Sequence, residues 1–174
     1  MSLPTMIEQY LDRHHIMAGQ VEHLPAYTAH QLAEMEHIPD QIVAKVVFFF
    51  LDDRMVMGVL PANRNLNLHR VKNFSAARYV RLATEREIAE QVKGVELGAV
   101  PPFGSLYGLP VLMDQAFLDT QQMFVPGGRL TQSLTLRMED YLREESPRIA
   151  PLSRRPIHHA PRPHREDYES YLDF

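Results

Sequence analysis

The first part of the chain has apolar residues at helical spacing. They are Met6, Ile7, Tyr10 and Leu11, and together they would form one face of a helix. Thr5 comes directly before them and is followed three residues later by Glu8, which is the pattern of an N-terminal capping box. We therefore predict a helix over residues 5–17.

Two more capping boxes mark helix starts further along the chain. The pairs are Thr28 with Gln31 and Thr84 with Glu87. They predict helices over residues 29–37 and 85–92, because a proline follows the first segment and a glycine follows the second.

Between these two helices the pattern changes to two apolar runs joined by a turn. Residues 42–51 predict a buried strand interrupted by Lys45, and residues 54–61 predict its hairpin partner. We also expect helices over residues 66–73 and 137–145 and strands over residues 78–82, 95–100, 109–113, 123–125 and 130–136. Helices and strands are mixed without repeated βαβ units, which favours an α+β fold with a mixed β-sheet flanked by helices.

The periodic pattern ends after Pro147. Residues 148–165 are rich in proline, arginine and histidine, which is typical of an extended segment, and residues 166–174 combine acidic and aromatic side chains. We therefore divide the chain into a domain of residues 1–147 and a tail of residues 148–174. The end of the tail either docks on the domain itself or binds a partner protein.

Composition narrows the classes of function. The chain has 174 residues, a net charge of −4 and a pI near 6.1, whereas proteins that coat nucleic acid carry a clear positive excess. It contains no cysteine, which excludes disulfides, thiolate metal ligands and a cysteine nucleophile. The longest apolar run is about half of a membrane span, and the first residues lack the pattern of a secretion signal. We expect a cytoplasmic protein that avoids membranes and contacts nucleic acid over a small surface.

Lys45 is unusual because it interrupts an apolar strand. Alternation along the strand permits a lysine that faces solvent. The same lysine would also suit a site in which its ammonium group attracts a phosphate or polarises a carbonyl. The sequence leaves both interpretations open.

Two glycine-containing segments are candidates for binding. Residues 98–104 place Pro101 and Pro102 between two glycines, which makes a stiff backbone that either joins two strands or walls a small pocket. Gly127 and Gly128 form either a backbone nest for an anion or a turn or bulge before a strand.

Asp114 and the nine histidines are further candidates. Asp114 follows a predicted strand, where it either caps the next turn or orients a catalytic group. His37 precedes Lys45 by a loop, so it either returns to the same site or lies on the surface. The histidine spacings match no metal-binding motif, and we expect neither a metal nor a cofactor.

Several of these segments, taken in order, resemble one family, the YbaK and prolyl-tRNA-synthetase-associated editing domains. The segments are Ala44-Lys45, residues 59–68, residues 94–104, the strand that ends at Asp114, and residues 124–142. The resemblance runs from about Thr28 to Pro147 and implies a mixed sheet that is partly barrel-like.

The resemblance also implies an activity, which is hydrolysis of the ester of a wrongly charged tRNA by a deacylase acting in trans. A lysine on the first core strand is required in that family, and Lys45 matches it. A G-x-x-x-P loop shapes the amino-acid pocket and places the attacking water, and Gly98 to Pro102 match its spacing. The terminal ribose hydroxyl of the substrate assists catalysis, so no metal is implied. The substrate-binding residues that we expect are Pro101, Phe103, Asp114, Gly127, Gly128 and His37.

The expected partner is the acceptor end of an aminoacyl-tRNA. Either the tail over residues 148–165 supplies further phosphate contacts, or a synthetase presents the tRNA. A small amino acid such as Ser, Thr or Ala is the expected substrate, because editing sites admit small side chains and refuse large ones. Two other functions stay open. One is a non-catalytic module that binds tRNA or a synthetase, and the other is a protein that docks partners through its tail.

Overall fold

The structure is a computed structural model, and it describes residues 2–156. Its α-helices are α1 (Thr5–Arg13), α2 (Ala29–Met35), α3 (Leu68–Ser75), α4 (Glu85–Gln91) and α5 (Met138–Glu145), and two short 3-10 helices are η1 (Gly104–Tyr107) and η2 (Gln115–Phe117). Its strands are β1 (Gly19–Glu22), β2 (Ala44–Leu51), β3 (Arg54–Pro61), β4 (Asn65–Leu66), β5 (Val80–Leu82), β6 (Val111–Asp114), β7 (Gln122–Arg129), β8 (Gln132–Arg137), β9 (Arg148–Ala150) and β10 (Ser153–Arg154).

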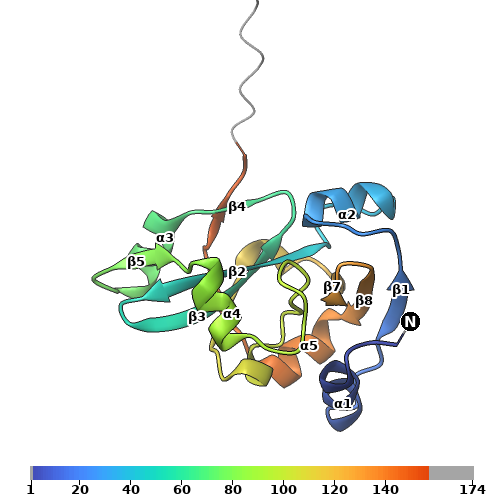
Figure 1. Cartoon of the computed structure of the whole chain (residues 1–174). Helices are drawn as coiled ribbons and strands as arrows, with labels where there is room; N and C mark the ends of the chain where they lie inside the picture. The colour runs from blue at the N-terminus through green and yellow to red at the C-terminus, as the bar shows by residue number, and fades with distance from the viewer. Residues whose placement is uncertain (1, 157–174) are drawn as a thin grey trace, which may run out of the picture.

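The strands form three sheets among the described residues (Figure 1). The largest has the order β5-β2-β3-β6-β9 and is mixed, because β3, β6 and β9 run parallel while β2 pairs antiparallel with β3 and β5. A second has the antiparallel order β1-β8-β7, and β4 pairs with β10. The two larger sheets meet where the Phe124 amide donates to the Ile42 carbonyl at 2.8 Å. The predicted α+β fold with a mixed sheet is therefore confirmed, and within residues 2–156 these sheets stay open rather than closing into a complete barrel.

The helix-start predictions succeed at two places and fail at one. Around α4 the box is complete, with Thr84 and Glu87 each bonding the other's backbone, and at α2 the Thr28 hydroxyl accepts from the Gln31 amide. The predicted box at Thr5 is wrong, because Pro4 occupies the N-cap position and Thr5 is already helical. Helix α1 also ends before the predicted residue 17, since His15 adopts a left-handed φ of 52°.

The strand predictions differ most in the loops. The β2–β3 hairpin is confirmed with Lys45 opposite Leu60. Residues 95–100 form a loop with a turn at Gly98, where φ is 88°, and not the predicted strand. Strand β7 continues through Gly127 and Gly128 with a register shift between Pro126 and Arg129, so the bulge interpretation of these glycines is correct.

The segment after Pro147 begins as part of the sheets. Strand β9 extends the largest sheet and β10 pairs with β4, while Ala150 and Leu152 are buried. The Arg64 Nε donates to the Ser153 hydroxyl at 2.6 Å, and Arg70 donates to the Ser153 carbonyl at 2.5 Å. The predicted tail therefore starts with paired residues, and its predicted acidic-aromatic end at residues 166–174 lies outside the described residues.

The main hydrophobic core lies between the two larger sheets and the helices α1 and α5. Ile7, Phe103 and Tyr141 are among its fully buried side chains. Helices α1 and α5 lie at the same end of the molecule, in the lower part of Figure 1. Among residues 2–156, no helix is long and apolar enough to cross a membrane.

Candidate active site

A cavity of about 610 Å³ opens between the two larger sheets. Its wall comes from the connection between β1 and α2, the start of β2, helix α4, residues 97–100, and the β7–β8 pair. Segments from both sheets therefore converge on one cavity, and two of the predicted site residues, Lys45 and Gly98, line it.

Lys45 lies in the wall of this cavity and is half-buried. Its Nζ donates to Asn65 Oδ1 over a long distance of 3.4 Å. Burial lowers the pKa of Lys45, and the nearby Asp40 carboxylate opposes this shift in part. An ammonium group that has lost water without a close carboxylate is ready to bind an anionic or carbonyl oxygen.

Gly98 also lines the cavity, and the loop around it is fastened to the β7–β8 pair. The Gly128 amide donates to the Ala99 carbonyl at 2.8 Å, and the Glu96 amide donates to the Gly128 carbonyl at 2.9 Å. Glu96 Oε2 accepts from the Leu130 amide at 2.6 Å. The loop is therefore held at a fixed position in the cavity wall.

Gly128 is required by crowding as well as by its φ of 92°. A Cβ at this position would lie 2.5 Å from Ile7 Cδ1 and 2.8 Å from Pro4 Cγ. Only glycine lets this strand pass so close to the start of α1. The first helix thus supports the glycine segment that in turn holds the loop.

The loop residues after Val100 lie behind the cavity rather than in its wall. Pro101, Pro102 and Phe103 are buried, and none of them lines the cavity in the described structure. Phe103 stacks on Tyr10 with ring centroids 4.4 Å apart, and the Tyr141 hydroxyl donates to the Pro102 carbonyl at 2.9 Å. The two prolines thus anchor the loop to the core, and the side facing the cavity comes from residues 97–100.

Three further predicted residues lie away from this wall. Asp114 is buried and accepts from the Ala116 amide at 2.8 Å, which is the capping arrangement that its position after a strand permits. His37 is exposed, with a left-handed φ of 53° after α2. Gly127 faces the Gln132 carbonyl and Leu3. Within residues 2–156 the cavity lining includes none of these three.

Several polar residues that line the cavity were not predicted from the sequence, and two of them, His23 and Ser133, contact each other. His23 Nε2 lies 2.8 Å from Ser133 Oγ, and His23 Nδ1 lies 2.7 Å from the Leu24 carbonyl oxygen. The alternation of Ser133 with Leu134 along β8 is a signal that could have placed the serine on the face opposite to that leucine. The contact with His23 spans 110 residues and leaves no mark in local spacing.

The charged groups in the cavity wall are Lys45, Arg129 and Glu85. Positive charge therefore exceeds negative charge at this wall. In the described part of the chain, no group of three or more histidine, cysteine, aspartate or glutamate side chains is arranged to hold a metal ion.

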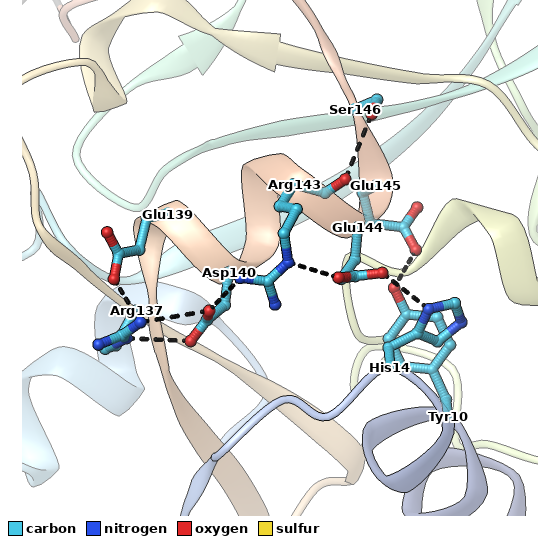
Figure 2. A network of polar contacts seen from close by, with 9 residues as sticks. All are labelled: Tyr10, His14, Arg137, Glu139, Asp140, Arg143, Glu144, Glu145 and Ser146. Atoms are coloured by element: carbon cyan, nitrogen blue, oxygen red, sulfur yellow. Dashed lines mark hydrogen bonds and ion pairs between the residues drawn. The ribbon is translucent and has the colours of Figure 1, made fainter.

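A network of polar contacts supports the cavity from the α1–α5 end (Figure 2). The Tyr10 hydroxyl donates to Glu145, and burial together with this contact raises the pKa of Tyr10. Glu145 also accepts from the Ser105 hydroxyl at 2.6 Å, just after the loop that reaches the cavity. His14 Nδ1 lies 2.9 Å from Glu144 Oε2, so α1 and α5 are joined at two points.

Comparison with known proteins identifies the family. Residues 23–144 match the family model described as the aminoacyl-tRNA editing domain, and the chain belongs to that family. The match begins at His23 and includes Lys45, the loop around Gly98 and the β7–β8 pair.

Individual relatives agree with this assignment. The chain is 30% identical over 94 residues to the proline–tRNA ligase of Streptococcus thermophilus, a match that covers 54% of this chain but only 15% of that protein. A protein described as a candidate trans-editing enzyme for prolyl tRNA synthetase superposes with a TM-score of 0.75 at 20% identity, over 88% of this chain and 99% of that one. The hypothetical protein APE2540 superposes with a TM-score of 0.76 at 20% identity, over 86% and 99% of the two chains. At such identities the two structural matches establish a shared fold.

Proposed function

We propose that this protein hydrolyses the ester bond of mischarged aminoacyl-tRNA as a separate, trans-acting enzyme. One observation carries the proposal. Lys45 and the Gly98 loop line the same cavity, in a chain that belongs to the aminoacyl-tRNA editing family.

Lys45 would hold the terminal phosphate or the ester carbonyl of the substrate. Burial disfavours its charged form, so an anionic oxygen at this position would gain from the interaction and would raise the pKa again. Backbone donors of the loop at residues 97–100 would orient the attacking water. The ester is already activated, so positioning and electrostatic stabilisation are the main tasks of the protein.

A small amino acid, such as Ser, Thr or Ala, is the substrate that we propose, and the contacts of the loop support this choice. The loop is tied to Gly128 and anchored through Pro102, so the wall cannot yield to admit a larger side chain. A synthetase discriminates a missing methylene by only about 1–3 kcal/mol, and a second site with a rigid wall removes the remaining errors.

The acceptor end of the tRNA would extend from Lys45 toward a second cavity of about 830 Å³. Asp40, Arg64 and Arg155 line this second cavity, and Asp40 is the carboxylate that acts on the Lys45 ammonium. Arginine side chains at this position would contact backbone phosphates of the tRNA. A synthetase partner would add affinity that a chain of net charge −4 lacks, and the cytoplasm is where such a complex would act.

The decisive experiment is deacylation of tRNAs charged with Ala, Ser, Thr, Cys and Pro by the wild type and by Lys45→Ala. We expect one small-residue ester to be hydrolysed and the rate to fall sharply in the variant. Lys72→Ala, which removes an exposed lysine on α3, is the matched control and should keep the wild-type rate. Hydrolysis no faster than the spontaneous rate across the panel would refute the enzyme.

Two outcomes would favour the other functions. Retained binding of tRNA or synthetase without hydrolysis would favour a non-catalytic module. Loss of a partner complex on removal of residues 157–174, with hydrolysis intact, would give the tail a docking role of its own.

A further inference from the structure

Both ring nitrogens of His23 have a hydrogen-bond partner, and one of these partners is Ser133. Nδ1 lies 2.7 Å from the Leu24 carbonyl oxygen and Nε2 lies 2.8 Å from Ser133 Oγ. Both residues line the cavity, and Ser133 is almost completely buried at 1% exposure. A buried hydroxyl beside a fixed imidazole therefore belongs to the wall of the candidate active site.

The two contacts fix the direction of the hydrogen bonds. A carbonyl oxygen can only accept, so Nδ1 must carry the proton that points at Leu24. In the neutral ring Nε2 then has a lone pair, and Ser133 must donate its single hydroxyl hydrogen to it. Because its hydroxyl hydrogen is used in the bond to His23, Ser133 Oγ can only accept a hydrogen bond from a group in the cavity.

Strand register places Ser133 across one strand from Lys45. Val43 and Phe124 form a parallel bridge between β2 and β7, and Lys45 and Pro126 lie two residues further along each strand. Pro126 is paired with Ser133 on β8, and both line the cavity together with Lys45. Lys45 and Ser133 therefore come from different strands that face the same cavity.

We propose that Ser133 binds the α-ammonium group of the aminoacyl ester and that His23 is the positioning residue that keeps its hydroxyl turned away from the ligand. This inference rests on the proposed function. An aminoacyl-tRNA carries a cationic ammonium at one end and anionic phosphates at the other. The cavity matches this distribution of charge, because Lys45 would bind the anionic end and Ser133 Oγ would accept a hydrogen bond from the ammonium group.

Charge supports this orientation over the reverse one. An α-ammonium group next to Lys45 or Arg129 would meet a like charge in a partly buried site. At Ser133 it would instead donate to an oxygen whose own hydrogen is committed to His23. The ester carbonyl and the phosphate then fall on the side of Lys45.

The test compares two substrates that differ only in this group, alanyl-tRNA and lactyl-tRNA, in which a hydroxyl replaces the ammonium. We expect Ser133→Ala to reduce kcat/KM for alanyl-tRNA about tenfold or more, mainly through KM, because a hydrogen bond to a charged group is lost. The value for lactyl-tRNA should change little. A merely structural role would lower both values together and would overturn the proposal.

Variants at His23 supply the second arm. His23→Ala should also lower the preference for alanyl-tRNA, while His23→Gln keeps an acceptor for the Ser133 hydroxyl and should restore part of it. His69→Ala, which removes an exposed histidine on α3, should match the wild type. Equal effects of His23→Ala and His23→Gln on the preference would contradict the role assigned to the imidazole.

A binding measurement separates this inference from the proposed function. The probe is 3′-alanylamino-3′-deoxyadenosine, a non-hydrolysable amide, compared with its lactyl counterpart by calorimetry. Weaker binding of the alanyl probe alone to Ser133→Ala would support the subsite even if the wild type hydrolysed no ester. If Ser133→Ala kept the wild-type preference for the alanyl probe over the lactyl probe, the proposed subsite would be wrong. Hydrolysis of the ester by the wild type would still support the proposed enzyme activity.

Discussion

Charged groups in the cavity wall and on helix α5 have different surroundings. On α5, Arg137 and Arg143 both pair with Asp140 and hold the pKa of its carboxyl below the usual value (Figure 2). In the cavity wall, burial makes the charged form of Lys45 less favourable, and its amide contact is long. The Asp140 carboxylate is paired within the folded protein, whereas the Lys45 ammonium would gain from the ligand that we propose for the cavity.

The difference also concerns solvent. The Arg137 and Arg143 side chains are 61% and 53% exposed, so each ion pair is screened and adds little to stability. Lys45 is partly withdrawn from water, where an interaction with substrate is stronger. Asp140 thus has close ion pairs near the surface, while the half-buried Lys45 has a long contact with Asn65.

Replacing Lys45 should have the largest effect on activity with no loss of stability. We expect Lys45→Met to lower kcat/KM for deacylation by about 100-fold, because the electrostatic contact with the reacting end is lost. Its lowered pKa means that the folded protein binds this proton less tightly than the unfolded chain does. The resulting destabilisation is present below the lowered pKa and vanishes above the ordinary value, so the variant should be at least as stable as the wild type at pH 7. A clear loss in the unfolding free energy would place Lys45 among the structural charges instead.

Gly128→Ala should damage both regions at once. The new Cβ would overlap Ile7 and Pro4 in a left-handed backbone, and we expect a loss of about 2–4 kcal/mol in the free energy of unfolding together with reduced activity. Gly108→Ala is the matched control, because Gly108 has a φ of 65° and a Cβ there would meet no other atom within 4 Å. Its cost should be about 1 kcal/mol, from backbone strain alone. Equal losses in urea unfolding would show that crowding by α1 is unimportant.

Arg155→Ala should weaken tRNA binding a few-fold while leaving the fold unaffected, since Arg155 is exposed beside the second cavity. The slope of log affinity against log salt should become shallower by about one contact. Fluorescence anisotropy with uncharged tRNA at several salt concentrations measures both quantities. An unchanged slope would remove the second cavity from the path of the acceptor end.

The smallest expected effect is the contribution of the two Asp140 ion pairs on helix α5 to stability at low pH. The lowered pKa of Asp140, caused first by Arg137 and then by Arg143, gives a stabilisation that is present above about pH 4 and lost as the pH falls further. Asp140→Asn should therefore lower Tm slightly at pH 7 and less at pH 3. A difference that grows on acidification would contradict the sign of this shift.

Local patterns in the sequence account for the elements that were predicted well. The β2–β3 hairpin and the α4 cap depend on residues next to one another along the chain, and both form as expected. The loop at residues 95–100 was misassigned because hydrogen bonds from Gly128, and not its own apolar pattern, determine its course. Pro101 and Pro102 were candidates for a pocket wall. Instead they are buried, because Tyr141 donates to the Pro102 carbonyl and Tyr10 stacks on the adjacent Phe103.

The candidate site was predictable only in part, for the same reason. Lys45 and Gly98 stood out because each breaks the pattern of its own segment, and both line the cavity. His23 and Ser133 break no pattern, and the bond that joins them spans 110 residues. Contacts of this kind are set by how the sheets meet, which a single sequence does not reveal.

The support of Gly128 by α1 has a practical consequence for defining the unit that folds. The matched family segment begins at residue 23 and ends at residue 144, yet Ile7, Tyr10 and Leu152 are buried outside it. An excised fragment of residues 23–144 would expose the faces that these side chains cover, and it would lack the strand paired with β8 next to Ser133. The segment matched by the family model is therefore shorter than the part of the chain that shares one hydrophobic core.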